Sequence, residues 1–227
     1  MLIGFIGQGF VGKSMADSFE ERGYSVVRYS LEPEYAENKD SIKNCDVVFI
    51  AVPTPTTPKG FDNSLVKKVI KLVGHGKIAV IKSTILPGTT SKIQKENSKL
   101  YVMHSPEFLT EANVVFETAN PERNVIGIPK DTAVFREKAE FVMSLLPKSP
   151  YSLVCSSEEA ELVKYAGNSF LYLKIVFVNI LYDYSKKIGA DWDKIAEATG
   201  RDPRIGKSHM KPYHKTSGKV GRGAGGH

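Results

Sequence analysis

The first two-thirds of the chain alternates short apolar runs with stretches of helical periodicity. Nearly continuous apolar runs such as Val47–Val52 are typical of strands buried on both faces of a parallel sheet. Helical patterns between several of these runs predict βαβ units, and therefore a sheet covered by helices on both faces. The predicted strands are Leu2–Ile6, Ser25–Tyr29, Asp46–Val52, Ile78–Lys82, Leu100–Met103, Asn124–Ile128 and Ser152–Cys155, and the predicted helices are Val11–Arg22, Asn63–Val73, Thr90–Asn97 and Thr132–Leu146.

The pattern changes at Ser156, where serines and the acidic pair Glu158 and Glu159 favour the start of a helix. An apolar helical pattern without proline then covers residues 157–188, and a second helix is predicted at Trp192–Thr199. A helix this long, with apolar residues over much of its surface, needs another domain or a second subunit to cover it. We therefore expect a homodimer formed through the helix at 157–188.

Composition and charge narrow the class of protein. The 227 residues are 41% hydrophobic and 25% charged, as in ordinary globular proteins. No apolar run reaches the roughly 18 residues of a membrane-spanning helix, and no targeting signal precedes the first strand, so we expect a cytoplasmic protein without a membrane partner. The net charge of +6 suits an anionic ligand or a solvated surface, and no basic face with interleaved aromatics predicts nucleic-acid binding.

The cysteines and histidines predict no metal site. Cys45 and Cys155 lie far apart without metal-ligand spacing, and two such thiols make no disulfide framework. We expect both to pack as small apolar groups. The five histidines likewise lack the spacing of a metal site or a catalytic triad.

A glycine-rich loop follows the first predicted strand and opens the first predicted helix. In Gly7-Gln8-Gly9-Phe10-Val11-Gly12, the first glycine permits a tight turn and the second lets a pyrophosphate approach the backbone. The third glycine packs the helix on the strand, and the phosphates bind at the amino end of that helix. This placement predicts a dinucleotide site in a Rossmann-type, doubly wound, mostly parallel α/β sheet over residues 1–155. A smaller all-helical domain with one long helix is expected over residues 156–227.

The end of the second strand leaves the cofactor open between NAD and NADP. NAD-preferring sites usually carry an acidic residue there, which binds the ribose hydroxyls. This chain has Ser30 at that position, and Glu32 follows two residues later. Glu32 reaching the ribose would favour NAD, whereas Ser30 together with Arg28 would tolerate a 2′-phosphate.

Three polar turns follow successive predicted strands. They are Val52-Pro53-Thr54-Pro55, the segment from Ser83 to Thr90, and the segment from Ser105 to Glu111. The carboxyl ends of parallel strands meet at one edge of the sheet, where ligands of such sheets bind. Each turn alone would indicate only a polar cap, but three in succession predict a binding site at this edge.

These segments, in this order, resemble conserved stretches of the UDP-glucose/GDP-mannose family of nucleotide-sugar 6-dehydrogenases. The resemblance continues through Asn120–Gly127, Glu159–Asn168, Asp202–Gly206 and Ser208-His209-Met210, and so covers essentially the whole chain. It implies an NAD-dependent enzyme that oxidises a sugar primary alcohol to a carboxylate in two hydride transfers. In this family a cysteine captures the intermediate aldehyde, and water then cleaves the resulting thioester.

The resemblance also assigns site residues. Thr84 would lie near the nicotinamide, Glu111 would act as a general base, and Lys164 and Asn168 would stabilise oxyanions at the reacting carbon. The four-residue spacing of Lys164 and Asn168 on one helix face supports their convergence on one ligand. The expected cofactor contacts are Gly7, Gly9, Phe10, Val11, Gly12, Ser30, Val52, Pro53, Thr54, Ser83, Thr84 and Glu111, and the expected substrate contacts are Glu107, Phe108, Leu109, Lys164, Asn168 and Arg204.

The resemblance stops short of the catalytic cysteine. In the family that cysteine closely follows a Gly-Gly pair, and here the last such pair, Gly225-Gly226, is followed only by His227. Ala224 stands where an aromatic residue is more usual. The second Rossmann-like domain of the family is also absent from the sequence. We therefore expect this chain to bind NAD and to dimerise without the nucleophile.

Two other functions fit parts of the sequence. A 3-hydroxyacid dehydrogenase also joins a glycine-rich domain to a long helix with a Lys-x-x-x-Asn pair and needs no cysteine. The segments Ser83–Thr90 and Ser105–Glu111 favour the nucleotide-sugar family over it. A non-catalytic dinucleotide-binding subunit is the other alternative, and the presence of Thr84, Glu111 and Lys164 argues against it.

Overall fold

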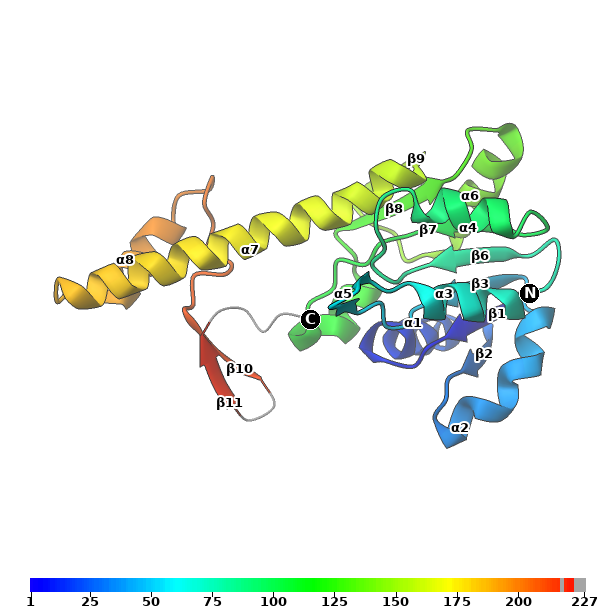
Figure 1. Cartoon of the computed structure of the whole chain (residues 1–227), viewed down its shortest axis with the longest axis horizontal. Coiled ribbons are helices and arrows are strands. Elements are labelled where there is room, and N and C mark those ends of the chain that lie inside the picture. The colour runs from blue at the N-terminus through cyan, green and yellow to red at the C-terminus, as the bar shows by residue number, and fades with distance from the viewer. Residues whose placement is uncertain (217–218, 223–227) are drawn as a thin grey trace. The chain divides into compact units, whose positions relative to one another are not determined.

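The computed structural model describes residues 1–216 and 219–222 (Figure 1). They form two compact units, which divide between Lys164 and Tyr165. The domain boundary expected at residues 155 and 156 stays a prediction.

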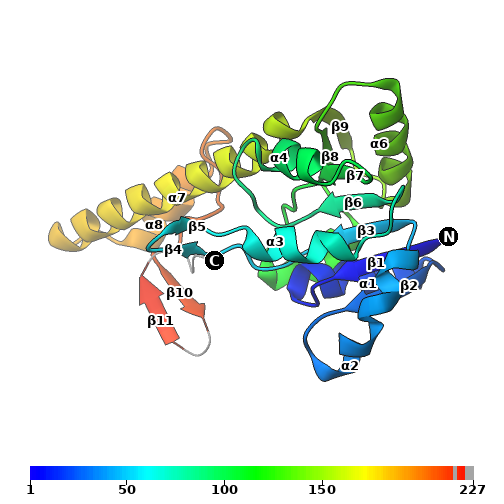
Figure 2. The same cartoon turned by 45° about the vertical axis from the view of Figure 1, so that its right-hand side comes forward.

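A seven-stranded sheet forms the centre of the first unit. Its order is β2-β1-β3-β6-β7-β8-β9, and Figure 2 shows β2, β1, β3 and β6 in this order across the sheet. All neighbouring pairs are parallel except β7 and β8, which are antiparallel. This confirms the predicted mostly parallel α/β sheet. The strands are β1 (Leu2–Ile6), β2 (Ser25–Tyr29), β3 (Val47–Ile50), β6 (Ile78–Ile81), β7 (Tyr101–His104), β8 (Arg123–Ile128) and β9 (Tyr151–Ser156).

Helices cover both faces of this sheet, and each face has its own apolar core. Residues of α1 and α6 pack with Phe5, Phe49 and Val80 on one face. Residues of η1, α3 and α4 pack with Ile50 and Ile81 on the other. The alternation of side chains along a strand divides neighbours such as Phe49 and Ile50 between these two cores. The helices are α1 (Phe10–Glu21), α2 (Pro33–Ala36), η1 (Glu37–Asn44), α3 (Ser64–Val69), η2 (Ile70–Leu72), α4 (Thr89–Glu96), η3 (Glu111–Asn113), α5 (Val114–Ala119) and α6 (Ala133–Leu145).

Several short elements of the first unit had no strong signal in the sequence. The helices α2 and η1 cover a polar segment, and α5 is only six residues long. A small antiparallel hairpin, β4 (Thr56–Thr57) with β5 (Gly60–Phe61), follows the proline-rich turn after β3. Helices and strands this short bury too few side chains to leave a periodic pattern.

The long predicted helix is present as α7 (Ser157–Lys187), which has 31 residues. Ser156 and Glu159 form a reciprocal capping box at its start, with the Ser156 N–H donating to Glu159 at 2.8 Å and the Glu159 N–H donating to the Ser156 hydroxyl at 3.3 Å. Gly189 ends it in a left-handed conformation, with φ of 72°. None of the helices in the described part of the chain is long and apolar enough to cross a membrane.

In the second unit, α8 (Trp192–Gly200) packs against the carboxyl-terminal half of α7. The small core contains Val178, Trp192 and Met210, and the rings of Tyr182 and Trp192 meet edge to face at 5.8 Å. An antiparallel hairpin follows, formed by β10 (Tyr213–Thr216) and β11 (Lys219–Arg222). The expectation of an all-helical second domain is therefore wrong. The hairpin segments are rich in glycine and lysine, and no alternating apolar pattern predicted strands there.

Candidate dinucleotide and substrate site

The order of the strands places a topological switch point between the loops that follow β1 and β3. The chain passes from β1 to β2 on one side and then returns to β3 on the other side of β1. The two connections leave the sheet in opposite directions at this point, and ligands of doubly wound sheets bind there. The loop from Gly7 to Gly12 follows β1, and the turn from Val52 to Thr54 follows β3.

The fold requires two of the three glycines in the first loop, whereas the third leaves space for a ligand. Gly7 has φ of +93°, and a Cβ there would lie 2.2 Å from the carbonyl oxygen of Ala51. A Cβ on Gly12 would lie 2.0 Å from the carbonyl oxygen of Gly7. Gly9 has an ordinary φ of −68°, and a Cβ there would meet no atom within 4 Å. The fold therefore needs Gly7 and Gly12, whereas the open space over Gly9 fits a ligand approaching the backbone.

The amino end of α1 fits an anion in that space. Gly9 is the N-cap residue and offers no side-chain cap, and the first turn of α1 contains no acidic residue. The N–H groups at the amino end of a helix and the helix dipole favour a phosphate group. Phe10 is 37% exposed and Val11 is half-buried beside them. These residues fit the pyrophosphate of a dinucleotide.

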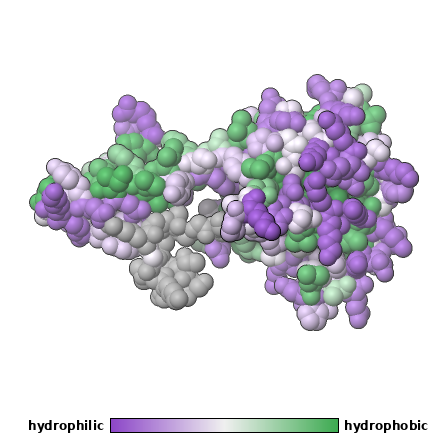
Figure 3. Space-filling model, viewed as in Figure 1, coloured by the Kyte–Doolittle hydropathy of each residue, from purple (hydrophilic) through white to green (hydrophobic). Residues whose placement is uncertain are grey.

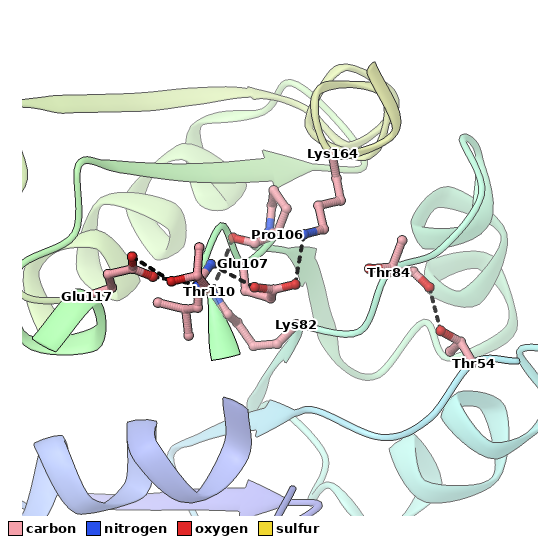
Figure 4. Close-up of polar contacts among 9 residues, drawn as sticks. Thr54, Lys82, Thr84, Pro106, Glu107, Thr110, Glu117 and Lys164 are labelled. Carbon is pink, nitrogen blue, oxygen red and sulfur yellow. Dashed lines mark hydrogen bonds and ion pairs between the residues drawn. The ribbon is translucent and has the colours of Figure 1, made fainter. Parts of the chain in front are cut away.

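Hydrogen bonds join the turns after β3 and β6. The Ser83 hydroxyl accepts from the Val52 N–H at 2.9 Å and donates to the Val52 carbonyl at 2.7 Å. The Thr54 hydroxyl donates to the Thr84 carbonyl at 2.7 Å, as Figure 4 shows. Ser83 is buried and Pro53 is exposed. The Ser83 and Thr54 hydroxyls thus fix the backbone on which Thr84 stands.

The loop after β7 carries Glu107, and α7 carries the lysine that binds it (Figure 4). The Lys164 ammonium donates to Glu107 Oε1 at 2.8 Å, and the second oxygen of Glu107 accepts from the Leu109 N–H at 2.8 Å. The side chains of Lys164 and Glu107 are only 10% and 15% exposed. The ring of Phe108 lies 3.9 Å from the Arg123 guanidinium and 6.0 Å from the Lys164 ammonium. The ion pair and the two cations fix this loop beside α7.

Lys82 lies below the same loop and was not predicted as a site residue. Its ammonium donates to the Ser105 hydroxyl at 3.1 Å and to the Pro106 carbonyl at 3.3 Å. Burial lowers the pKa of Lys82 to about 8, with nearby Glu107 opposing the shift and Lys164 adding to it. The sequence feature that could have identified Lys82 as a site residue is the presence of a lysine at the end of the apolar run Ile78–Ile81.

A cavity of about 290 Å³ opens behind the Glu107 loop, within the first unit. Lys82, Glu107 and Phe108 line it together with Phe19 of α1 and Phe116 of α5. The loop therefore lies between this cavity and the amino-terminal turns of α7.

Comparison with known families identifies this arrangement. Residues 30–143 match the NAD binding domain of the UDP-glucose/GDP-mannose dehydrogenase family, and residues 158–226 match the central domain of the same family. The chain belongs to this family. Both predicted halves of the resemblance are thereby confirmed.

Individual relatives agree with this assignment. The chain is 34% identical over 209 residues to the putative UDP-glucose 6-dehydrogenase YtcA of Bacillus subtilis, covering 85% of this chain and 48% of that protein. It is 29% identical to the UDP-glucose 6-dehydrogenase AglM of Haloferax volcanii, covering 92% and 60%. The UDP-glucose dehydrogenase structure from Pyrobaculum islandicum matches with a TM-score of 0.80 and 30% identity, covering 92% of this chain and 58% of that one. The chain thus spans about half the length of these relatives.

Three further predicted site residues of this family member are exposed in the first unit or belong to the second unit. Glu111 lies exposed in η3. Asn168 and Arg204 belong to the second unit, where Arg204 is paired with Asp202 at 2.6 Å. Ala224 and the Gly-Gly pair before His227 lie outside the described residues. The roles of Glu111, Asn168 and Arg204 stay predictions.

Neither cysteine in this chain has the environment of a nucleophile. Burial raises the pKa of Cys45 and that of Cys155 to about 11 in each case. A cysteine nucleophile reacts as the thiolate, which such shifts disfavour at neutral pH. Within the described residues, no group of three or more histidine, cysteine or acidic side chains is arranged to hold a metal ion.

Proposed function

We propose that the protein containing this chain is an NAD-dependent nucleotide-sugar 6-dehydrogenase. It would oxidise the primary alcohol of a nucleotide-linked sugar to a carboxylate in two steps. The observation that carries the proposal is the buried pair of Lys164 and Glu107, which lies at the carboxyl edge of a sheet with an open glycine loop. A subunit that only bound a dinucleotide would have no use for a desolvated lysine and carboxylate beyond the cofactor site.

The residues of this chain would bind and orient the reactants. NAD, when bound, supplies the hydride acceptor. The backbone at Gly9 would hold its pyrophosphate, and the turn at Thr84 would lie beside the nicotinamide. Lys164 would stabilise negative charge that develops on the sugar oxygen, and Asn168 would assist it. Glu107 would hold the lysine in place, and Glu111 would act as a base during release of the acid.

We further propose NAD over NADP as the cofactor. The guanidinium of Arg28 is held by Asp17 at 2.6 Å and by Glu20 at 2.7 Å, and its side chain is only 12% exposed. An arginine bound in this way is not available for a 2′-phosphate. The Ser30 hydroxyl accepts from the Glu32 N–H at 3.2 Å, and this hydrogen bond holds the backbone of Glu32 close to the end of β2. Glu32 is exposed and would accept from ribose hydroxyls while repelling a phosphate.

A homodimer through α7 is also proposed. Large apolar side chains on the carboxyl-terminal part of α7 are exposed at spacings of three and four residues, and this series is named the α7 stripe: Phe170, Leu173, Phe177, Ile180, Tyr184 and Ile188, the last lying just beyond the helix, with exposed fractions between 58% and 67%. Figure 3 shows hydrophobic side chains gathered over this helix. Residues at this spacing share one helix face, as in the contact seam of packed helices. A second copy of the chain offers the same stripe and would cover it.

The proposed reaction has a stoichiometry that distinguishes it from its rivals. The natural protein, expressed from its gene, is to be supplied with NAD and with UDP-glucose, GDP-mannose or UDP-N-acetylmannosamine in turn. The proposal predicts two NADH for each uronic acid formed from one of these substrates. One NADH per turnover with a 3-hydroxyacid, or NAD binding without turnover of any substrate, would contradict it.

A further inference from the structure

Besides Lys164, the first turns of α7 carry a buried acidic side chain that has no role in the proposed reaction. Glu161 is fully buried, and its carboxylate accepts three hydrogen bonds. The Gly88 N–H donates at 2.6 Å, the Thr90 N–H at 2.8 Å and the Thr90 hydroxyl at 2.6 Å. Thr90 is itself fully buried.

These donors belong to the amino end of α4. Gly88 is the N-cap residue of α4, and, having no side chain, it cannot cap the helix itself. Glu161 therefore caps α4 from another helix, and the helix dipole favours a carboxylate at that point. Burial raises the pKa of Glu161, while the hydrogen bonds from Thr90 and Gly88 oppose the shift.

The capped segment begins with the predicted nicotinamide-contacting residue. Only three residues separate Thr84 from Gly88. The carbonyl of Thr84 is held by the Thr54 hydroxyl, and the other end of the segment is held by Glu161. The short connection between these two points leaves the backbone of Thr84 little freedom.

The same turn of α7 also carries Lys164, three residues after Glu161 and on the same side of the helix. Lys164 binds Glu107 in the loop after β7, whereas Glu161 binds the segment after β6. One helical turn therefore holds both loops.

This turn of α7 is seated tightly on the sheet. A Cβ on Gly127 of β8 would lie 2.6 Å from the Cβ of Ala160 and 2.8 Å from the Cα of Ser157. The absence of a side chain at Gly127 lets the helix approach this closely. Ser157 also contacts Ser91 of α4, with their hydroxyl oxygens 3.1 Å apart. The first turns of α7 are thus held firmly against β8 and α4, and Glu161 joins the segment after Thr84 to them.

We propose that Glu161 is a positioning residue for the dehydrogenase reaction. It fixes the Thr84 segment relative to Lys164, so that the nicotinamide half of the cofactor and the reacting carbon of the sugar meet in one geometry. This inference rests on the proposed function, because it gives Thr84 and Lys164 their roles. A residue needed only for stability would not have to be a carboxylate, since apolar side chains of similar volume often replace buried polar groups at little cost.

The test compares the chain with two variants and a matched control. Glu161→Gln places an amide NH₂ against one of the N–H donors of α4, and Thr90→Val removes one hydroxyl donor while keeping the shape of the side chain. Glu159→Gln is the control, because Glu159 lies two residues away, is exposed, and binds only at Ser156. Thr90→Val keeps the test decisive if Glu161→Gln fails to fold.

Two readouts are needed. Hydrogen exchange followed by mass spectrometry reports on the backbone of residues 83–90, and equilibrium titration compares NADH with ADP-ribose, which lacks the nicotinamide. We expect exchange in residues 83–90 to become about tenfold faster in Glu161→Gln, because buried donors lose their acceptor. We expect NADH affinity to fall by about tenfold with ADP-ribose affinity unchanged. Thr90→Val should show smaller changes of the same kind, and Glu159→Gln none.

Other outcomes would overturn the inference. Unchanged exchange in residues 83–90 would show that Glu161 does not restrain the segment. Equal weakening of NADH and ADP-ribose would show a merely structural role, and equal affinity of the unmodified chain for both would show that the segment gives the nicotinamide no useful contact. If the unmodified chain bound neither ligand, the proposed function itself would fail, whatever the exchange pattern.

Discussion

Lys164 of α7 and Glu107 of the loop after β7 form an ion pair of 2.8 Å that is largely shielded from water. Its two charges lie 57 positions apart in the sequence, so the pair forms only when α7 docks beside the sheet. Such a pair costs desolvation energy when it forms, and removal of one partner leaves the other charge buried and unpaired. The contact therefore stabilises the docking of α7 beside the loop after β7 and also fixes the orientation of the Lys164 side chain.

The first prediction concerns the stability of this pair. Lys164→Met should lower the free energy of unfolding by about 3 kcal/mol, because Glu107 loses its partner in a shielded site. Lys67→Met is the control, since Lys67 pairs with Glu96 on the surface, where a pair contributes about 1 kcal/mol or less. Urea denaturation measures both. Equal losses in the two variants would show that the Lys164 pair is no stronger than a surface pair.

A second prediction concerns acid stability. His104 is fully buried in β7, and burial, together with the nearby charge of Lys82, lowers its pKa to about 3. An unfolded histidine titrates near pH 6.5, so the unfolded state binds the extra proton first as the pH falls. The folded state should therefore lose stability between pH 6.5 and pH 3, by up to about 1.4 kcal/mol per pH unit from this residue.

His104→Leu removes this titration while keeping an apolar side chain in the core. Urea denaturation at several pH values between 7 and 4 should show a shallower loss of stability in the variant than in the unmodified chain. The two curves should run parallel above pH 7. Parallel curves across the whole range would mean that His104 titrates normally in the folded protein.

A third prediction concerns cofactor choice. The double variant Asp17→Asn with Glu20→Gln should release Arg28, which would then be free to bind a 2′-phosphate. The affinity for NADP relative to NAD should rise by about tenfold. Glu21→Gln on the same helix serves as the control and should leave the ratio unchanged. An unmodified chain that prefers NADP would refute the cofactor proposal directly.

A fourth prediction concerns assembly. Phe177→Glu places a charge in the middle of the α7 stripe and should shift the chain from dimer to monomer, because the charge would be desolvated in the contact. Lys186→Glu is the control, since Lys186 lies nine residues further along and therefore on the opposite helix face. Analytical ultracentrifugation at several concentrations distinguishes the two. A monomeric unmodified chain would show that something other than a second copy covers the stripe.

Much of the fold could be predicted because its signals are local. The strands β3 and β6 are continuous apolar runs that are fully buried, and the glycine loop lies directly after β1 as its spacing indicated. The serines and the acidic pair at 156–159 marked the start of α7 in the same way, and Ser156 and Glu159 form a capping box there. Each of these features depends on residues close together in the sequence.

The features that were missed depend on residues far apart. The sequence predicted only that Glu161 lies on a helix, because its hydrogen-bond donors at Gly88 and Thr90 lie more than seventy positions earlier. Lys82 gave no periodic signal, since its partners come from the neighbouring strand's loop. Tertiary contacts of these kinds have no expression in local sequence. The hairpin of β10 and β11 was missed for a different reason, because its strands are neighbours in the sequence but lack an alternating apolar pattern.

Calorimetric titration of NAD into the chain and into Gly9→Ala tests whether the glycine loop holds the dinucleotide. A methyl group at Gly9 meets no atom of the protein, so thermal stability should be unchanged. The same methyl group would occupy the space assigned to the pyrophosphate, so NAD affinity should fall by at least about tenfold. If Gly9→Ala binds NAD as tightly as the unmodified chain, the pyrophosphate does not lie at this loop. If the unmodified chain binds no NAD, the proposed dinucleotide site is contradicted.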